Sequence, residues 1–174
     1  KEYFIDREKG ILYVYKTDDF ESSEIVMSCT LENLLNATNI SYITLKGFGA
    51  CATRSNGFSL NGHDFIIDNC KVYNVRSGGI AASGNNITIQ NCEISDVGSY
   101  GISISGGDAS TLTPSGNLVY NNYIHDFGVV ERTYQGAISA SGCGITVSHN
   151  EMAHAPHLAV PYGGPLHVFE YNEI

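Results

Sequence analysis

A phrase of six residues with fixed apolar positions returns along the chain. Ile67–Val72 aligns with Ile89–Ile94 at an offset of 22 residues, and the phrase returns after 30, 28 and 22 further residues. Its first and last positions are always apolar, and its fourth is Asn or Cys in five of six copies. The three columns are Leu45, Ile67, Ile89, Val119, Val147 and Phe169; Ala50, Val72, Ile94, Ile124, Met152 and Ile174; and Phe48, Cys70, Cys92, Asn122, Asn150 and Asn172. Such self-similarity predicts a solenoid.

A further strand is predicted in each repeat, because residues that alternate in and out with period two follow the phrase. These runs are Gly57–Leu60, Gly79–Ala82, Gly101–Ile104 and Gly136–Ala140. No 3.6-residue apolar period is sustained, and the leucine-rich-repeat phrase is missing. The pattern therefore predicts an all-β fold: a right-handed, single-stranded parallel β-helix with coils of about 22 residues and three strands per coil.

Stacking of like residues in successive coils explains the column of Asn and Cys. Asn side chains can hydrogen-bond along such a column inside a turn, where an unpaired polar group would be costly. We expect Cys70 and Cys92 to fill the same column as small side chains rather than as a disulfide. The chain has 5 Cys and no CxxC pair, so zinc-site spacing is absent.

The ends of the chain differ from the repeats. Residues 1–20 read as a hairpin with a Gly-bearing turn, expected to lead into the first coil and cover its edge strands. Residues 21–174 are the coils, the first of them irregular, and no linker divides them, so we predict one domain over 1–174. Because the chain opens on Lys1 and closes on Asn172–Ile174 in mid-pattern, we expect a piece of a longer protein, with further C-terminal coils as its structural partner.

Charge and hydropathy narrow the partners. The formal net charge is −9, which disfavours nucleic acid and, more weakly, a polyanionic polysaccharide. No apolar run approaches the roughly 18–20 residues that span a bilayer, so no membrane partner is expected.

Two repeats are lengthened by insertions, at 107–116 and 129–135. Insertions in solenoids commonly form loops on the binding side, although a purely decorative loop is the alternative. The first contains Asp108. The second brings Glu131, Arg132 and Tyr134 together, and we predict that Asp108, Arg132 and Tyr134 contact substrate.

Polar chemistry is concentrated after residue 107, where five of the 6 His lie. Stacking would place Asn74, Asp96, Asp126 and His154 in one column near a turn. Strands one coil apart stand about 4.8 Å apart, close to the roughly 5–5.5 Å between the carboxyl groups of a retaining glycosidase. Asp96 and Asp126 are therefore candidates for such a pair; the alternative is that they cap turns.

His154 and His157 have HxxH spacing, which on a helix would suggest a metal pair. Pro156 and the β context remove that geometry, so we expect hydrogen bonding to a sugar or simple loop packing. A polysaccharide lyase would want a calcium-binding Asp cluster and a Lys or Arg base, but no Lys falls in the His-rich half. We predict no metal and no cofactor.

Several segments carry a family resemblance: Leu112–Asn117, Asn122–Phe127, Arg132–Tyr134, Ala155–His157 and Glu170–Ile174. They resemble the secreted β-helix proteins of polysaccharide-degrading bacteria, and most of all the glycoside hydrolases of the xylanase and α-L-fucosidase type, family 141. The resemblance implies a cleft along the helix face with His125, Arg132, Tyr134 and His157 near the sugar. It also implies a secreted, cell-surface or periplasmic bacterial location.

The sequence therefore predicts a carbohydrate-active domain, part of a glycoside hydrolase acting on plant or host polysaccharide or oligosaccharide. Asp126 and His125 are the predicted catalytic residues, and Asp108, Arg132, Tyr134, His154 and His157 the predicted substrate-binding residues. A non-catalytic carbohydrate-binding or structural β-helix and a polysaccharide lyase are the two alternatives.

Overall fold

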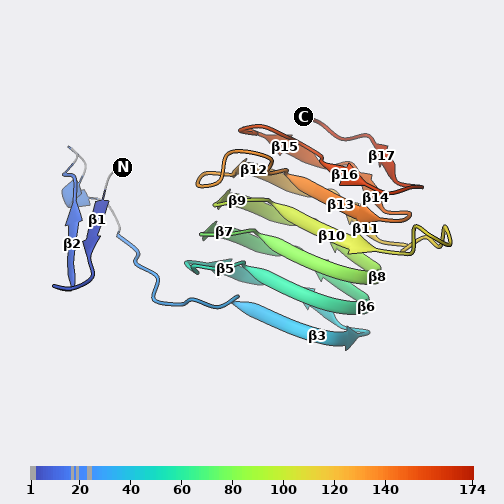
Figure 1. The fold of residues 1–174 in the computed structure, drawn as a ribbon, viewed down its shortest axis with the longest axis horizontal. Helices are drawn as coiled ribbons and strands as arrows, with labels where there is room; N and C mark the ends of the chain where they lie inside the picture. Colours follow the sequence, from blue (N-terminus) through green and yellow to red (C-terminus); the bar gives the residue numbers. More distant parts are fainter. Residues whose placement is uncertain (1–2, 17, 19, 23–24) are drawn as a thin grey trace.

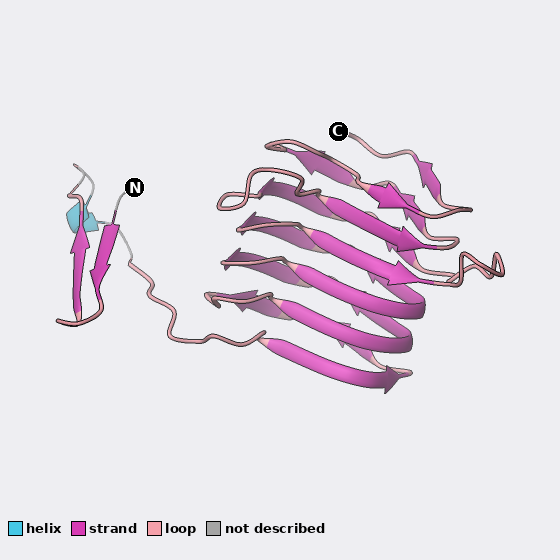
Figure 2. Ribbon diagram, viewed as in Figure 1, coloured by secondary structure: helices cyan, strands magenta, loops and turns pink. Residues whose placement is uncertain are grey.

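The computed structural model describes residues 3–16, 18, 20–22 and 25–174. An antiparallel hairpin of β1 (Tyr3–Asp6) and β2 (Ile11–Val14) precedes a short 3₁₀ turn, η1 (Phe20–Ser22), and a stack of parallel strands follows (Figures 1 and 2). The described helical turn is far too short to cross a membrane. The hairpin and the all-β solenoid confirm the predicted fold class.

The solenoid is built from two parallel sheets. The five-stranded sheet contains β5 (Gly49–Cys51), β7 (Lys71–Val75), β9 (Glu93–Val97), β12 (Tyr123–Phe127) and β15 (Glu151–Ala153). The ten-stranded sheet contains β3 (Leu35–Ser41), β4 (Thr44–Lys46), β6 (Phe58–Asp68), β8 (Ile80–Gln90), β10 (Ile102–Gly106), β11 (Leu118–Tyr120), β13 (Ile138–Gly142), β14 (Thr146–Ser148), β16 (Tyr162–Gly163) and β17 (Val168–Glu170).

The predicted columns are the observed strand registers. Leu45, Ile67 and Ile89 are partners in successive strands, and the column continues to Phe169. The second column runs in the same way from Ala50 to Met152. Their central members are fully buried, and each such side chain stabilises the fold by about 1.5–3 kcal/mol. The apolar columns are thus the core of the solenoid.

Three separate strands per coil, as expected, occur in the first coil and in the later ones, but not in the coils of β6 and β8. In β6 and β8 two of the expected strands join into one, which bends at Gly62 and Gly84 without losing its pairing. Both glycines have positive φ, and a Cβ at Gly84 would collide with the Gly62 carbonyl oxygen. Glycine therefore permits a bend where the sequence suggested a strand end.

The Asn and Cys column is a hydrogen-bonded ladder. The backbone N–H of Cys92 donates to Oδ1 of Asn122 at 2.9 Å, and the N–H of Asn122 donates to Oδ1 of Asn150 at 3.0 Å. Asn150 donates in turn to Oδ1 of Asn172 at 2.9 Å. Sulfur takes the same place one coil earlier, since the N–H of Cys70 lies 3.4 Å from Sγ of Cys92. Both thiols are free, as predicted.

The hairpin does not cover the first coil by strand pairing. β1 and β2 pair with each other, and β3 pairs with β6 and with no other strand in the described part of the chain. Figure 1 shows the hairpin standing apart from the coils at the end of an extended segment. The expected cap over the edge strands is therefore not formed by strand pairing.

The two insertions lie at opposite corners of the coil. Residues 107–117 join β10 to β11 at one side of Figure 1, and residues 128–137 join β12 to β13 at the other side. The two loops therefore do not form one binding side.

Candidate functional site

The candidate site is built on a column of left-handed residues at the end of the five-stranded sheet. Asn74, Asp96, Asp126 and His154 have φ of 51°, 51°, 51° and 56°. The strand registers on each side of Asp96 and Asp126 place these residues in successive coils, as predicted. Asn and Asp tolerate this backbone better than most residues, because their short polar side chains can hydrogen-bond locally. The column thus repeats one left-handed backbone position in successive coils, one residue before the ends of β7, β9 and β12 and directly after β15.

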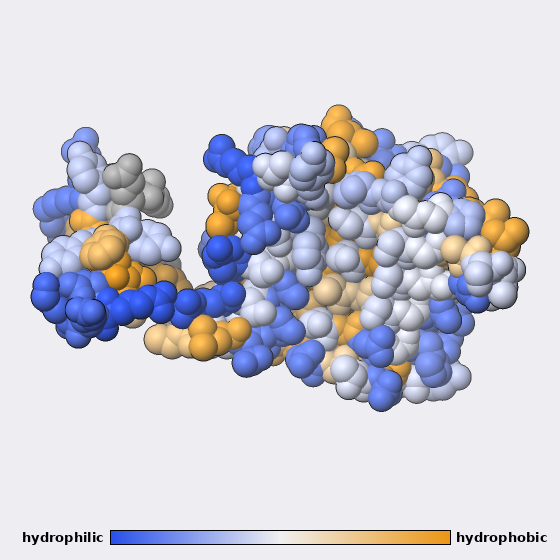
Figure 3. All heavy atoms as spheres, in the orientation of Figure 1, coloured by the Kyte–Doolittle hydropathy of each residue, from blue (hydrophilic) through white to orange (hydrophobic). Residues whose placement is uncertain are grey.

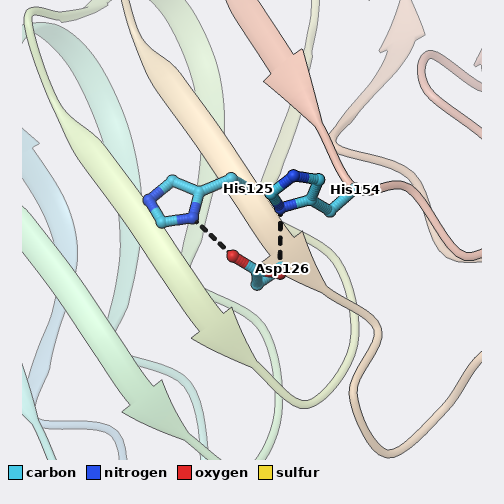
Figure 4. A group of neighbouring side chains, drawn as sticks. All are labelled: His125, Asp126 and His154. Carbon is cyan, nitrogen blue, oxygen red and sulfur yellow. Dashed lines mark hydrogen bonds and ion pairs between the residues drawn. The ribbon is translucent and has the colours of Figure 1, made fainter.

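Asp126 is hydrogen-bonded to two histidines. Its Oδ2 lies 2.7 Å from Nδ1 of His125, and its Oδ1 lies 3.1 Å from Nδ1 of His154. Figure 4 shows both rings directed at the carboxylate, His125 from β12 and His154 from the turn after β15. The hydrogen bond from His125 holds the pKa of Asp126 below its ordinary value, against a smaller opposing effect of burial. An ionised carboxylate only accepts, so each Nδ1 carries the hydrogen.

A second carboxylate lies on the other side of His125. Oε1 of Glu93 is 3.8 Å from Nε2 of His125 and 2.8 Å from the Lys71 ammonium. The hydrogen bond from Lys71 lowers the pKa of Glu93. The Tyr123 ring stacks on His125 with the centroids 4.3 Å apart. His125 is therefore held at Nδ1 and on one ring face, and Glu93 lies near its Nε2.

A shallow groove of about 400 Å³ lies beside the cluster. It follows the turn between the two sheets. Its lining includes Lys71, Glu93 and Tyr123, together with the exposed Asn91 and Asn121. Amide, charged and aromatic groups line an open surface here, a mixture that suits a polar ligand with apolar faces. In Figure 3 the visible face of the coils is mainly polar or neutral, with apolar residues showing in strips.

Tyr134 and His157 contact each other and form a second pair of predicted site residues. The backbone N–H of Tyr134 donates to Nδ1 of His157 at 3.0 Å, and the two rings meet edge to face at 5.2 Å. Arg132 lies exposed on the same insertion. A Cβ at Gly128 would collide with the Pro156 ring. The start of the insertion therefore packs closely against the segment that carries His154 and His157. The second insertion thus lies at the cluster's corner of the coil.

Asp108 does not join these residues. Its Oδ1 accepts from the backbone N–H of Ser110 at 2.8 Å and from the Ser110 hydroxyl at 2.6 Å. It closes its own turn in the first insertion, at the opposite corner of the coil (Figure 1). Asp96 holds its predicted place in the column. Both oxygens of Asp126 are directed to imidazoles, however, and not to Asp96.

Three residues of the site were not predicted: Lys71, Glu93 and Tyr123. They are stacked partners in β7, β9 and β12. The repeat contains the signal, because each directly follows the Asn and Cys column. Extending the alignment by one position would have found them, and with them a Lys close to the His-rich half.

Comparison with known proteins agrees with the fold. Residues 56–161 match the family described as "Right handed beta helix region". No curated protein gives a significant sequence match. The structure is similar to the A-module of the mannuronan C-5 epimerase AlgE4 of Azotobacter vinelandii, with a TM-score of 0.50 and 14% identity. The match covers 83% of this chain and 55% of that one, so the chain spans about half of its neighbour's length.

Proposed function

The chain belongs to the right-handed β-helix family, and we propose that it is a carbohydrate-active domain, part of a glycoside hydrolase acting on plant or host polysaccharide. The observation that carries the proposal is the placement of the His125–Asp126–His154 cluster beside the groove of Tyr123. An aromatic face and nearby amide and charged groups bind sugar rings, and imidazole and carboxylate groups handle protons near neutral pH.

The chain's charge bears on the substrate. Its net charge of −9 favours a neutral glycan over a polyanion, because like charges repel. Its structural neighbour is named for mannuronan, and that name supports a polysaccharide ligand in general terms. We further propose a secreted, cell-surface or periplasmic bacterial location, which suits a polymer that does not enter cells.

A specific feature favours a second candidate, a solenoid that binds carbohydrate without cleaving it. Glycoside hydrolysis requires a protonated acid as well as a base or nucleophile. Both oxygens of Asp126 accept hydrogen bonds, and Glu93 accepts from the Lys71 ammonium. Neither carboxylate has a proton to donate. The glycosidase proposal therefore needs an acid from another group, such as one on further coils of a longer chain, whereas the second candidate needs none.

The test is turnover by the longest natural form of the protein on xylan and on fucosylated oligosaccharides. New reducing ends, lost in Asp126→Asn and in Arg132→Ala but retained in the matched Asp96→Asn variant, are the expected result. Binding without turnover establishes the second candidate. Unsaturated sugar products establish a lyase, and equal turnover in all four proteins removes the cluster from the reaction.

A further inference from the structure

We propose that His125, Asp126 and His154 bind a divalent transition-metal ion. One ligand atom from each residue lies within 4.8 Å of the other two. Two imidazole nitrogens and a carboxylate oxygen form the ligand set of three-ligand zinc sites, which keep a fourth position for water or substrate. The inference concerns the cluster used in the proposed function, but it stands without any carbohydrate.

The spacing of the ligand atoms fits such an ion after a small opening. Zinc bonds to nitrogen and oxygen of about 2.0–2.2 Å place tetrahedral ligand atoms roughly 3.4 Å apart. The two Nδ1-to-oxygen distances are 2.7 and 3.1 Å. These contacts run to different oxygens of Asp126. The His154 side chain is 68% exposed and can move outward by the few tenths of an ångström that its own contact requires, and the His125 contact must open by about 0.7 Å. The metal would replace the Nδ1 hydrogens that now bind the carboxylate.

The backbone holds these ligands before any ion arrives. Asp126 and His154 occupy the same left-handed position in successive coils, and His125 is the neighbouring residue on β12. His125 and Asp126 therefore stand on the paired strand β12, and His154 directly follows β15. Rigid placement lowers the entropy lost on binding.

Glu93 and Tyr123 complete the arrangement around His125. A histidine that binds metal through one ring nitrogen usually donates its other N–H to a carboxylate. With Nδ1 on the metal, Nε2 of His125 faces Oε1 of Glu93 at 3.8 Å, and Lys71 fixes Glu93 from the other side. Tyr123 stacks on the ring. A bound ion with an open position would activate water or orient a hydroxyl group.

The HxxH spacing noted in the sequence plays no part, because Nδ1 of His157 accepts from the backbone of Tyr134. The pairing of His154 with His125 and Asp126 spans two coils, and no contiguous motif reveals it.

The chain contains its own control for this site. In β6, Nδ1 of His63 lies 2.7 Å from Oδ2 of Asp64, and Asp64 has φ of 54°. One coil later Asn86, also left-handed, donates to Oδ1 of Asp64 at 3.0 Å. The two corners match, except that Asn86 stands where the cluster has His154. The His63 corner offers two ligands instead of three.

The experiment is zinc titration of the metal-stripped protein by calorimetry, with the bound metal counted after dialysis. We expect one ion per chain. In His154→Asn, which copies the His63 corner and keeps a residue tolerant of left-handed backbone, affinity should fall by more than the roughly 10–100-fold that loss of an outer carboxylate partner costs. In Glu93→Gln the zinc affinity should fall by about 10–100-fold. His63→Asn should bind as the unsubstituted protein does.

Equal zinc binding by the unsubstituted protein and His154→Asn, or equal losses in His154→Asn and His63→Asn, would overturn the site. Circular dichroism of each variant shows whether lower zinc affinity comes from a missing ligand or from misfolding. If His154→Asn misfolds, His154→Gln takes its place in the comparison. The titration contains no sugar, so its result does not depend on the proposed function. If the protein binds zinc but turns over no glycan, the glycosidase proposal fails and the metal site stands.

Discussion

Asp126 and His154 adopt the same left-handed backbone 28 residues apart, and the imidazole of one reaches the carboxylate of the other at 3.1 Å. The contact follows from the stacking of one turn position on the next. The contributions of the side-chain contact and of the left-handed backbone to stability can therefore be tested separately.

Replacing Asp126 with Asn should lower the free energy of unfolding only slightly, because Asn accepts left-handed φ but its single amide oxygen replaces only one of the two oxygens that meet histidines. Replacing it with Val should lower that free energy by about 1–2 kcal/mol, the usual cost of this backbone for other residues. Urea unfolding measures both changes. Asp96→Val, one coil earlier at the same φ of 51°, is the control and should lose a similar amount; a loss confined to Asp126 would contradict the backbone explanation.

Asn122→Ala should destabilise the solenoid by about 2–6 kcal/mol. The amide accepts from the N–H of Cys92 at 2.9 Å and donates to the carbonyl of Ile89 at 3.0 Å. Its removal leaves both buried groups unpaired, at about 1–3 kcal/mol each. Asn122→Cys should lose less, because Cys92 already fills this column with sulfur. Equal losses in the two variants, measured by chemical unfolding, would mean that sulfur does not replace the amide at this position.

The five cysteines should differ sharply in reactivity. Burial raises the pKa of the Cys92 thiol to about 12, so its reactive thiolate is scarce at neutral pH. Cys29 is exposed, whereas Cys70, Cys92 and Cys143 are buried. Brief alkylation followed by mass spectrometry should label Cys29 first and the three buried thiols only after unfolding. Rapid labelling of Cys92 in the folded protein would contradict its place in the ladder.

Stability should fall in acid partly through Asp68. Hydrogen bonds from Lys46, at 2.7 Å, and then from Asn91 lower the pKa of this carboxyl from its ordinary value of 3.8. A carboxyl with a lowered folded pKa contributes stability above its unfolded pKa and loses it as the pH falls through the folded value. The contribution should therefore disappear below about pH 4.

Unfolding curves between neutral pH and strong acid measure this loss. The pH dependence should be shallower in Asp68→Asn than in the unsubstituted protein. Asp18→Asn, at an exposed position, serves as the comparison and should leave the slope as it is. Parallel curves for all three proteins would exclude Asp68 from the acid response.

Much of the fold was predictable because stacking imposes a one-dimensional rule. Leu45, Ile67 and Ile89 recur because each must fill the same place in the core of the next coil, and their registers follow the alignment. The strand predicted over Gly79–Ala82 ends too early, because the pairing continues through a bend at Gly84 that the alternating pattern does not reveal. The hairpin was recognised from its Gly-bearing turn, but its position depends on tertiary contacts that no periodicity encodes.

The site was only partly predictable. The column of Asp96, Asp126 and His154 followed from the repeat, but which way each side chain hydrogen-bonds did not. His125 and Glu93 meet because residues two apart on a strand share a face while partners stack between strands. Asp108 was assigned to the site from its insertion alone, and insertions at different corners of one coil are equally conspicuous in sequence.

Because the coils repeat, each surface position has an equivalent position in the coils above and below it. A substitution at one such position changes the local chemistry and leaves the neighbouring coils in place. The His63, Asp64 and Asn86 corner shows the same device with one different side chain. Duplication of a coil between β12 and β15 would preserve the core while separating Asp126 from His154 by one more coil. Whole-coil duplication thus offers this architecture a route to gain or lose a reaction centre in a single step.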